Sequence, residues 1–452
     1  MEASKNLKAP SLQITAQHMA RYWRWALLFI ALLAFFLRAY FAFSAVVDHP
    51  IRGDAIQYVT AAWNMVHRHA FSITPPDNPA VVGDSYRDPG YPCFLAGWLL
   101  LFGHVGEKWY SAILAAQALL GAVTIPLLLS ALRHHLPERW LLGGGLFMAV
   151  WPHSVTVCSY LLSETLFAFL CSLSLFLLSF TLNRKGYLWP ILCGLGFGTA
   201  ALTNAMLIPF ALLLAAGLYG LRYLDRKSAL ALAAAGLLLP ATWQVRNMQL
   251  PASNETSGGR ALINFVQGSW PEYHSSWRAY VGGNQLAKRM QEQILEEANL
   301  LREQPASGAK AILTRFQQAP AHYFFWYLSK PMQLWGWDIQ IGQGDIYIYP
   351  TLHSPFSYNL FLRAVAALCH AANPLLMLFA AWGCLTSLLR KTSTGGMAAA
   401  LALMALYSTL IYSVLQAEPR YAIPFRGVEI ALATIAMWQI CAWVKRHRRP
   451  VA

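Results

Sequence analysis

Long apolar runs recur along the whole chain, and they constrain its fold more than any other feature. A helix of about 20 apolar residues crosses a bilayer, where each backbone polar group must be satisfied within the protein. Only 12% of the residues are charged, whereas a typical soluble domain is about 25% charged. The sequence therefore predicts an all-α polytopic membrane protein with about ten or eleven membrane helices. The runs lie at 25–47, 91–102, 112–132, 140–151, 161–182, 189–203, 205–221, 230–244, 360–389, 397–415 and 428–444.

Basic residues gather in short clusters beside these runs. The net charge of +14 would by itself also fit a nucleic-acid-binding protein. Lys and Arg beside apolar runs are instead typical of the cytoplasmic side of a membrane protein. We therefore expect cytoplasmic termini, membrane lipid as the surroundings and no nucleic-acid partner. The clusters lie at 21–24, 133–139, 183–185, 222–227, 390–391 and 445–449.

The seven cysteines indicate neither a disulfide framework nor a zinc site, because most lie in apolar runs without CxxC or Cys/His spacing. We predict no metal site; the sequence does not decide whether a divalent ion assists. The first apolar run is too long for a signal-peptide core and lacks a small-residue cleavage site, so we expect an uncleaved first span.

The runs divide the chain into three predicted parts. Residues 1–244 form a catalytic membrane module whose first outer loop is 48–92. Residues 245–355 form an outer region, and residues 356–452 form the last spans with a cytoplasmic tail. Both outer segments should carry juxtamembrane helices.

Residues 54–68 place apolar side chains three or four positions apart, which predicts a helix with one face suited to the bilayer surface. Residues 285–318 are charged and helical, and their acidic residues fit a solvated face. The aromatic stretch 323–337 predicts an interfacial approach, followed by a second outer loop at 338–355. The apolar positions are Ile56, Val59, Trp63 and Val66, and the acidic ones are Glu292, Glu296, Glu297 and Glu303.

The first outer loop is unusually rich in charge. Residues 48–92 hold five of the 20 acidic residues of the chain, with three arginines and six prolines. A connector between spans needs no such chemistry, and an ionisable group at an apolar boundary is costly unless it is paired or hydrated. We therefore interpret this loop as half of an active site. Polar positions expected on the same face are His153, Glu164, Asn204, Arg246, Arg420 and Tyr421.

Two carboxylates are the candidate catalytic residues, and each has a simpler interpretation. Asp54 begins the predicted helix, so it fits an N-cap. It also fits a general base whose pKa is raised by partial desolvation, with Asp48 and Asp88 as weaker alternatives. Glu164 begins an apolar run, so it fits either a helix-start acid that interacts with the dipole or a second carboxylate that orients substrate.

Four arginines beside the spans also have two interpretations. They fit headgroup anchors, and their planar, permanently charged groups equally suit a phosphate. These are Arg87, Arg246, Arg420 and Arg426. His49 and His153 fit hydrogen-bonding loop residues better than metal ligands.

Several short motifs occur in an order that resembles a known family. Span one ends in Arg-x-Tyr, the loop holds Gly-Asp-x-x-x-Tyr and Arg-x-Pro-Gly-Tyr-Pro, and the next run ends in Phe-Gly. The order resembles the integral-membrane glycosyltransferases of the C superfamily, most closely the bacterial branch of protein O-mannosyltransferases and lipid A aminoarabinose transferases. The motifs cover Arg38, Tyr40, Gly53, Asp54, Tyr58, 87–92, 102–103, 163–167, 243–247 and 420–424.

The resemblance implies a catalytic aspartate in the first outer loop, at Asp54. It also implies a basic residue that meets the donor phosphate, at Arg87. Asp88 stands where the family more usually has a proline. The chain carries no large soluble domain after its last span, so we expect residues 245–355 to recognise the acceptor.

These observations predict a multi-pass enzyme of the bacterial inner membrane. It would transfer a sugar from a polyprenyl-phosphate donor to a hydroxyl of a protein, lipid or glycan on the outer (periplasmic) face, with inversion. The expected catalytic residues are Asp54 and Glu164, the expected phosphate ligands are Arg87, Arg246 and Arg420, and the expected substrate contacts are Tyr58, Asp88, Asn204 and Tyr421.

Two alternatives remain open. One is a flippase or transporter of a lipid-linked glycan, which would need polar residues along a route through several spans. The other is a polysaccharide polymerase or ligase, which uses similar chemistry on a lipid-linked glycan acceptor. The sequence identifies neither the sugar nor the acceptor.

Overall fold

The computed structural model describes residues 9–251, 256–337, 349–390 and 395–447. Within these residues, seven helices are long and apolar enough to cross a membrane. An eighth span is formed if α5 (Glu138–Val150) and the segment Pro152–Ser159, which meet at a bend of 57°, are counted as one. The seven lie in α1 (Ala9–Ser44), α4 (Glu107–Leu132), α7 (Glu164–Asn183), α10 (Arg226–Asn247), α17 (Leu360–Leu389), α18 (Gly396–Val414) and α20 (Arg426–His447).

Three shorter apolar segments complete the bundle. They are α3 (Gly90–Phe102), α8 (Leu188–Thr203) and the stretch Ala205–Gly220, which contains α9 (Phe210–Gly220). The expected ten or eleven segments included these short helices as well as the long ones. The predicted all-α polytopic architecture is confirmed.

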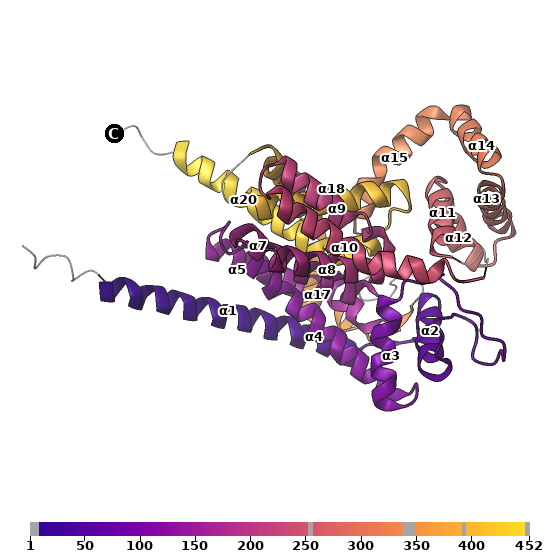
Figure 1. Ribbon diagram of the computed structural model, residues 1–452, viewed down its shortest axis with the longest axis horizontal. Helices are drawn as coiled ribbons and strands as arrows, with labels where there is room; N and C mark the ends of the chain where they lie inside the picture. The colour runs from indigo at the N-terminus through magenta and orange to yellow at the C-terminus, as the bar shows by residue number, and fades with distance from the viewer. Residues whose placement is uncertain (1–8, 252–255, 338–348, 391–394, 448–452) are drawn as a thin grey trace, which may run out of the picture.

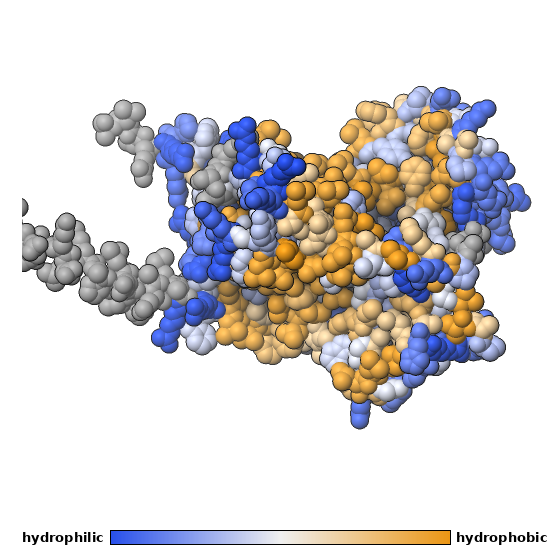
Figure 2. Space-filling model, viewed as in Figure 1, coloured by the Kyte–Doolittle hydropathy of each residue, from blue (hydrophilic) through white to orange (hydrophobic). Residues whose placement is uncertain are grey.

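Polar and apolar parts of the molecule are separated along its long axis. In Figure 1, α1 begins and α20 ends at the left, whereas α2, α3 and the helices from α11 to α15 gather at the right. Figure 2 shows an apolar belt between polar residues at both ends. We call the right-hand end the loop end. Its further helices are α2 (Asp54–Arg68), α11 (Ser257–Gly268), α12 (Tyr273–Val281), α13 (Gln285–Glu303), α14 (Pro305–Gln318) and α15 (Pro320–Leu334).

The helix predicted at 54–68 is confirmed as α2, but its apolar face does not lie on the bilayer. Val59 is buried, and Trp63 and Val66 pack in the same cluster, which includes residues of α3. Only Ile56 is substantially exposed, at 49%. Burying an apolar face against protein removes as much surface from water as burying it in lipid. The sequence pattern does not distinguish the two environments.

Helices α11 to α14, which we call the outer bundle, enclose a small core of their own. The helical stretch expected at 285–318 is broken before Pro305, because proline lacks an N–H and restricts the preceding residue. The prediction that the acidic residues of this stretch lie on a solvated face is wrong for Glu297, whose side chain keeps only 10% of its surface exposed. Its carboxylate accepts a hydrogen bond from Arg315 at 2.9 Å and another from the Trp270 indole at 2.7 Å.

A short antiparallel strand pair ties the two loop regions together. Strand β1 (Val46–Val47) pairs with β2 (Thr351–Leu352), with Val46 opposite Leu352. The second outer loop expected at 338–355 is described only from Tyr349 onward; residues 338–348 lie outside the described residues.

Glycines allow α8 to approach α10 closely. A Cβ atom at Gly194 would lie 2.4 Å from the Leu232 carbonyl oxygen, and one at Gly198 would lie 2.9 Å from the Gly236 carbonyl oxygen. Small residues at such contacts let backbones approach each other, which is the usual basis of helix packing in membranes.

We expect Gly194→Ala to destabilise the protein by about 1–3 kcal/mol, because the new methyl group overpacks this contact. Thermal unfolding in detergent, followed by size-exclusion chromatography of the soluble fraction, measures the effect. Gly143→Ala is the matched control, since a Cβ there meets nothing within 4 Å. Equal unfolding temperatures for the two variants would contradict the proposed packing.

Candidate functional site

Asp54 is the first residue of α2, and the preceding backbone holds it in place. Gly53 has a φ of 54°, in the left-handed region that glycine adopts most easily. The Tyr349 hydroxyl accepts a hydrogen bond from the Ala55 N–H at 3.2 Å and donates one to the Arg52 carbonyl at 2.8 Å. Residues from the first and second loops therefore fix the start of this helix together.

The Asp54 carboxylate lies between two arginines. The Arg87 Nη2 atom is 2.5 Å from Oδ1, and the Arg420 Nη2 atom is 2.8 Å from Oδ2. Both oxygens bond to guanidinium groups, so the N-cap interpretation of Asp54 does not describe its contacts. Asp54, Arg87 and Arg420 were expected on the same face of the protein, and the structure brings all three into contact.

Arg420 also bonds to the second candidate carboxylate. Its Nε lies 2.6 Å from Glu164 Oε1, at the first turn of α7. Arg420 and Glu164 keep only 9% and 8% of their side-chain surface exposed, whereas Asp54 keeps 31%. The carboxylate of Asp54 is therefore the most accessible group of this network, as a group that meets a substrate must be.

Arg87 is oriented by neighbours on α2. Its Nε donates to Gln57 Oε1 at 2.5 Å, and its guanidinium carbon lies 4.9 Å from the centre of the Tyr58 ring. Tyr58 packs edge-on against Tyr91. A guanidinium over an aromatic face is attracted by the ring quadrupole, so the Tyr58 ring helps to hold the Arg87 side chain in position.

The electrostatics of Asp54 differ from the expectation. Burial alone would raise its pKa, but the nearby Arg87 and Arg420 guanidinium groups hold the pKa of Asp54 below its ordinary value. The predicted upward shift is therefore wrong in this state of the site. Two carboxylates and two guanidinium groups make the network neutral, and Asp54 in it is a weak base.

Asp88 and Asn204 meet at the end of α8, beside the network. Asp88 Oδ2 accepts from the Ala205 N–H at 3.1 Å and from Arg260 Nη2 at 3.1 Å. Asn204 Oδ1 accepts from the Met206 N–H at 3.2 Å. These contacts organise the backbone after α8 and attach α11 to the first loop.

Arg246 contacts the backbone of the first loop, and Tyr421 packs against an aromatic neighbour. Arg246 donates to the carbonyl oxygens of Asp84 and Phe71, at 2.5 and 3.2 Å, and stacks on Trp243. The Tyr421 ring stacks on Tyr412 with centroids 5.0 Å apart. Arg246 thus braces the first loop.

Arg426 and His153 lie deeper in the bundle. Arg426 pairs with Glu429 at 2.7 Å and donates to the backbone at the end of α15. The His153 ring packs 4.3 Å from that of Trp337. Neither residue contacts the Asp54 carboxylate.

Three residues near the network were missed from the sequence. Gln57 lies three positions after Asp54, so helical spacing already placed it on the same side of α2. Arg260 lies 5.8 Å from the Tyr86 ring, which Arg87 also approaches at 5.6 Å. Neither Arg260 nor Tyr349 carries a local signal, because only tertiary contacts bring them here.

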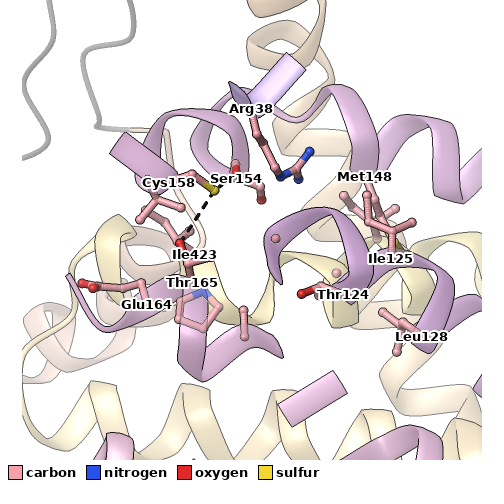
Figure 3. Close-up of a pocket in the computed structure, with 16 residues that line it drawn as sticks. Arg38, Thr124, Ile125, Leu128, Met148, Ser154, Cys158, Glu164, Thr165 and Ile423 are labelled. Carbon is pink, nitrogen blue, oxygen red and sulfur yellow. Dashed lines mark hydrogen bonds between the residues drawn. The ribbon is translucent and has the colours of Figure 1, made fainter. Parts of the chain in front are cut away.

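A small cavity lies behind Glu164, inside the bundle (Figure 3). Its volume is about 40 Å³, which is room for two or three waters. Figure 3 shows the Arg38 guanidinium directed into the cavity and the Glu164 carboxylate directed away from it. Thr165 donates to the Cys158 sulfur at 3.8 Å in its wall. A hydrated space here would solvate the buried charge of Arg38.

The part of the chain that the structure describes shows no cluster of metal-ligating side chains. Among the described residues, no group of three His, Cys, Asp or Glu side chains could hold a metal ion. The oxygens of Asp54, and one of Glu164, already accept from arginines. We therefore derive no catalytic step through a metal.

Comparison with solved structures finds the same overall fold in an archaeal enzyme. The Archaeoglobus fulgidus oligosaccharyltransferase, tethered with an acceptor peptide containing the NVT sequon, matches with a TM-score of 0.55 at 14% identity, over 94% of this chain and 50% of that chain. The same organism's oligosaccharyltransferase AglB has been solved in complex with an inhibitory peptide and a dolichol-phosphate. It matches with a TM-score of 0.50 at 15% identity, over 94% of this chain and 51% of that chain.

A bacterial structure overlaps less closely. ArnT from Cupriavidus metallidurans, bound to undecaprenyl phosphate, gives a TM-score of 0.38 at 16% identity, over 94% of this chain and 79% of that chain. No protein-family model and no curated protein matches the sequence. The chain shares its overall fold with the archaeal oligosaccharyltransferase, and it spans about half the length of the archaeal enzymes.

The lowered pKa of Asp54 predicts how stability depends on pH. A carboxylate with a depressed pKa stabilises the folded state above its unfolded pKa of about 3.9, and this contribution is lost as the pH falls further. The difference in unfolding temperature between wild type and Asp54→Asn should therefore shrink between about pH 7 and pH 3.5.

Thermal unfolding of the detergent-purified proteins at both pH values measures this difference. Asp77→Asn serves as the control, because Asp77 is an exposed residue of the same loop. A wild-type advantage over Asp54→Asn that grows on acidification would contradict the arginine pairing.

Proposed function

We propose that this protein transfers a sugar from a polyprenyl-phosphate donor to a hydroxyl acceptor at the outer (periplasmic) face of the bacterial inner membrane. The observation that carries this proposal is the partly exposed Asp54 carboxylate between Arg87 and Arg420. Asp54 begins α2, which belongs to the loop end (Figure 1). A lipid-linked donor would place its phosphate where the apolar belt meets this end of the molecule. The acceptor is a protein, lipid or glycan that carries a free hydroxyl.

A lipid phosphate is the chemistry that these arginines suit best. Guanidinium groups bind phosphate oxygens through paired, charge-assisted hydrogen bonds. The archaeal oligosaccharyltransferase with the same fold has been solved with dolichol-phosphate, which supports a lipid phosphate as ligand. Without a ligand, Asp54 accepts hydrogen bonds from the same guanidinium N–H groups of Arg87 and Arg420 that a phosphate would use.

Donor binding then activates Asp54. The incoming phosphate draws Arg87 and Arg420 toward itself, so the carboxylate loses the charges that hold its pKa down. Glu164 remains bonded to Arg420 through Nε and keeps this arginine at the site. Asp54 thus becomes a useful base only when the donor is in place.

The reaction is a single displacement. Asp54 accepts the proton of the acceptor hydroxyl, and the hydroxyl oxygen forms a bond to the anomeric carbon of the sugar. The bond between that carbon and the phosphate oxygen breaks, and its electron pair leaves with polyprenyl phosphate. Arg87 and Arg420 stabilise the charge on the leaving phosphate. Attack opposite the leaving group inverts the anomeric centre.

The other predicted site residues take supporting parts in this proposal. Tyr58 and Asp88 line the first loop beside Arg87, and Asn204 and Tyr421 lie on neighbouring segments that would contact sugar or acceptor. Arg246 contributes to phosphate binding only through the loop that it braces, since its own contacts are the carbonyl oxygens of Asp84 and Phe71.

Asp54→Asn should lower sugar transfer by about 10²–10⁴-fold, which is the usual contribution of a general base. The assay uses the purified protein in vesicles, a panel of radiolabelled polyprenyl-phosphate sugars, and envelope extract as the source of acceptor. Asp77→Asn should keep wild-type turnover. Near-normal turnover of folded Asp54→Asn would refute the assignment, and movement of the label across the bilayer without covalent transfer would favour a flippase.

Arg87→Ala should raise KM for the lipid donor by about 10-fold or more, because a charge-assisted hydrogen bond contributes about 1.5–3 kcal/mol. The KM for the acceptor should change little. Initial rates with one substrate varied at a time separate the two constants. If Arg87→Ala raised only the KM for the acceptor, Arg87 would be assigned to acceptor binding and not to binding of the lipid donor.

A further inference from the structure

The segment that delivers Arg420 to the site is irregular and needs support. Residues 415–418 link α18 to the single turn α19 (Pro419–Ala422), which carries Arg420. Leu415 is neither helical nor extended, with φ −84° and ψ −119°. Since no regular helix runs through these residues, contacts from elsewhere must set their position.

The outer bundle supplies the closest of these contacts. Gly268 is the last residue of α11, and a Cβ atom there would lie 1.5 Å from the Leu415 carbonyl oxygen. No side chain fits in that space, so the backbone of α11 rests directly on the linker. The Trp326 indole donates to the Gly268 carbonyl at 3.0 Å and fixes this end of α11.

Two side-chain pairs continue the same contact. The Gln416 amide donates to Gln267 on α11, and Glu418 Oε1 lies 2.8 Å from His274 Nδ1 on α12. The His274 and Glu418 side chains keep only 20% and 14% of their surface exposed. The outer bundle therefore contacts the linker at three of its four residues.

Lys330 also contacts the start of the linker. Its buried Nζ donates to the carbonyl oxygens of Ser413 and Leu415, at 2.8 and 3.0 Å. Lys330 belongs to α15, the helix that leads from the outer bundle back to the spanning helices in Figure 1. The end of α18 and the start of the linker thus contact both α11 and α15.

We propose that the outer bundle is part of the catalytic machinery, because it positions Arg420 through Gly268 and His274. These two are positioning residues, since they act on the site through the linker. The proposal rests on the proposed function, in which Arg420 binds the donor phosphate. A displacement of the linker by about 1 Å would break the 2.8 Å contact of Arg420 with Asp54, and such a misplacement costs about 10²-fold in rate.

The test uses dodecyl phosphate as a probe of the phosphate site in the purified full-length protein. Binding is measured by isothermal titration, and Arg420→Gln defines the loss that follows from removing the arginine. Gly268→Ala should weaken binding by about 10-fold and lower turnover with the lipid donor by about 10²-fold. Gly258→Ala, on the same helix, should bind as wild type, because the nearest atom to its Cβ is 3.9 Å away.

His274 provides a second pair of variants in case Gly268→Ala does not fold. His274→Ala should weaken dodecyl phosphate binding, and His274→Gln should restore it, since glutamine can still donate to Glu418. If His274 only stabilised the fold, two variants with the same unfolding temperature would bind dodecyl phosphate equally well. Different binding at equal unfolding temperature therefore supports a positioning role.

The outcomes distinguish the two proposals. If wild type does not bind dodecyl phosphate, or if Arg420→Gln binds it as tightly as wild type, the phosphate site of the proposed function is wrong. If wild type binds and Arg420→Gln does not, but the folded Gly268 and His274 variants match wild type in binding and turnover, positioning by the outer bundle is overturned.

Discussion

The ion network around Arg420 is the interaction on which the loop end depends. It joins four residues from separate segments. Asp54 begins α2, Arg87 lies in the loop that follows α2, Glu164 begins α7 and Arg420 lies in α19. A mostly buried guanidinium is costly unless carboxylates pair with it. Removing either carboxylate would leave the positive charge of Arg420 less compensated. The separate segments are thus held together by the requirement for charge balance.

The same pairing gives the site a resting state. Asp54 is bonded to two cations, so it is a weaker base than an isolated carboxylate. An anionic ligand would compete for those cations and free the carboxylate. Within the proposed function, this competition couples arrival of the donor to activation of the base. The coupling requires no movement of a helix, only an exchange of hydrogen-bond partners by Arg87 and Arg420.

The scaffold around the network follows from the fold shared with the archaeal oligosaccharyltransferase. Apolar helices supply a rigid platform, and the loops between them carry the polar residues. The contribution of this chain is the way its outer bundle rests on the linker before Arg420, with glycine at the point of closest approach. In the proposed arrangement, this backbone contact and the His274–Glu418 pair together hold the linker.

The sequence by itself determined the class of fold and the segment that holds half of the site. Apolar length, basic clusters and the charge of residues 48–92 are local properties, and they predicted the spans and α2, and Asp54 and Arg87 as candidate site residues. Only the tertiary structure decided that Glu164 and Arg420 meet, that Arg246 braces a loop, and that the pKa of Asp54 is lowered. Tyr349, Arg260 and Gly268 likewise gain their positions from contacts across the chain. A pKa or a close backbone approach depends on which groups lie within a few ångströms, and periodicity along a sequence carries no such distances.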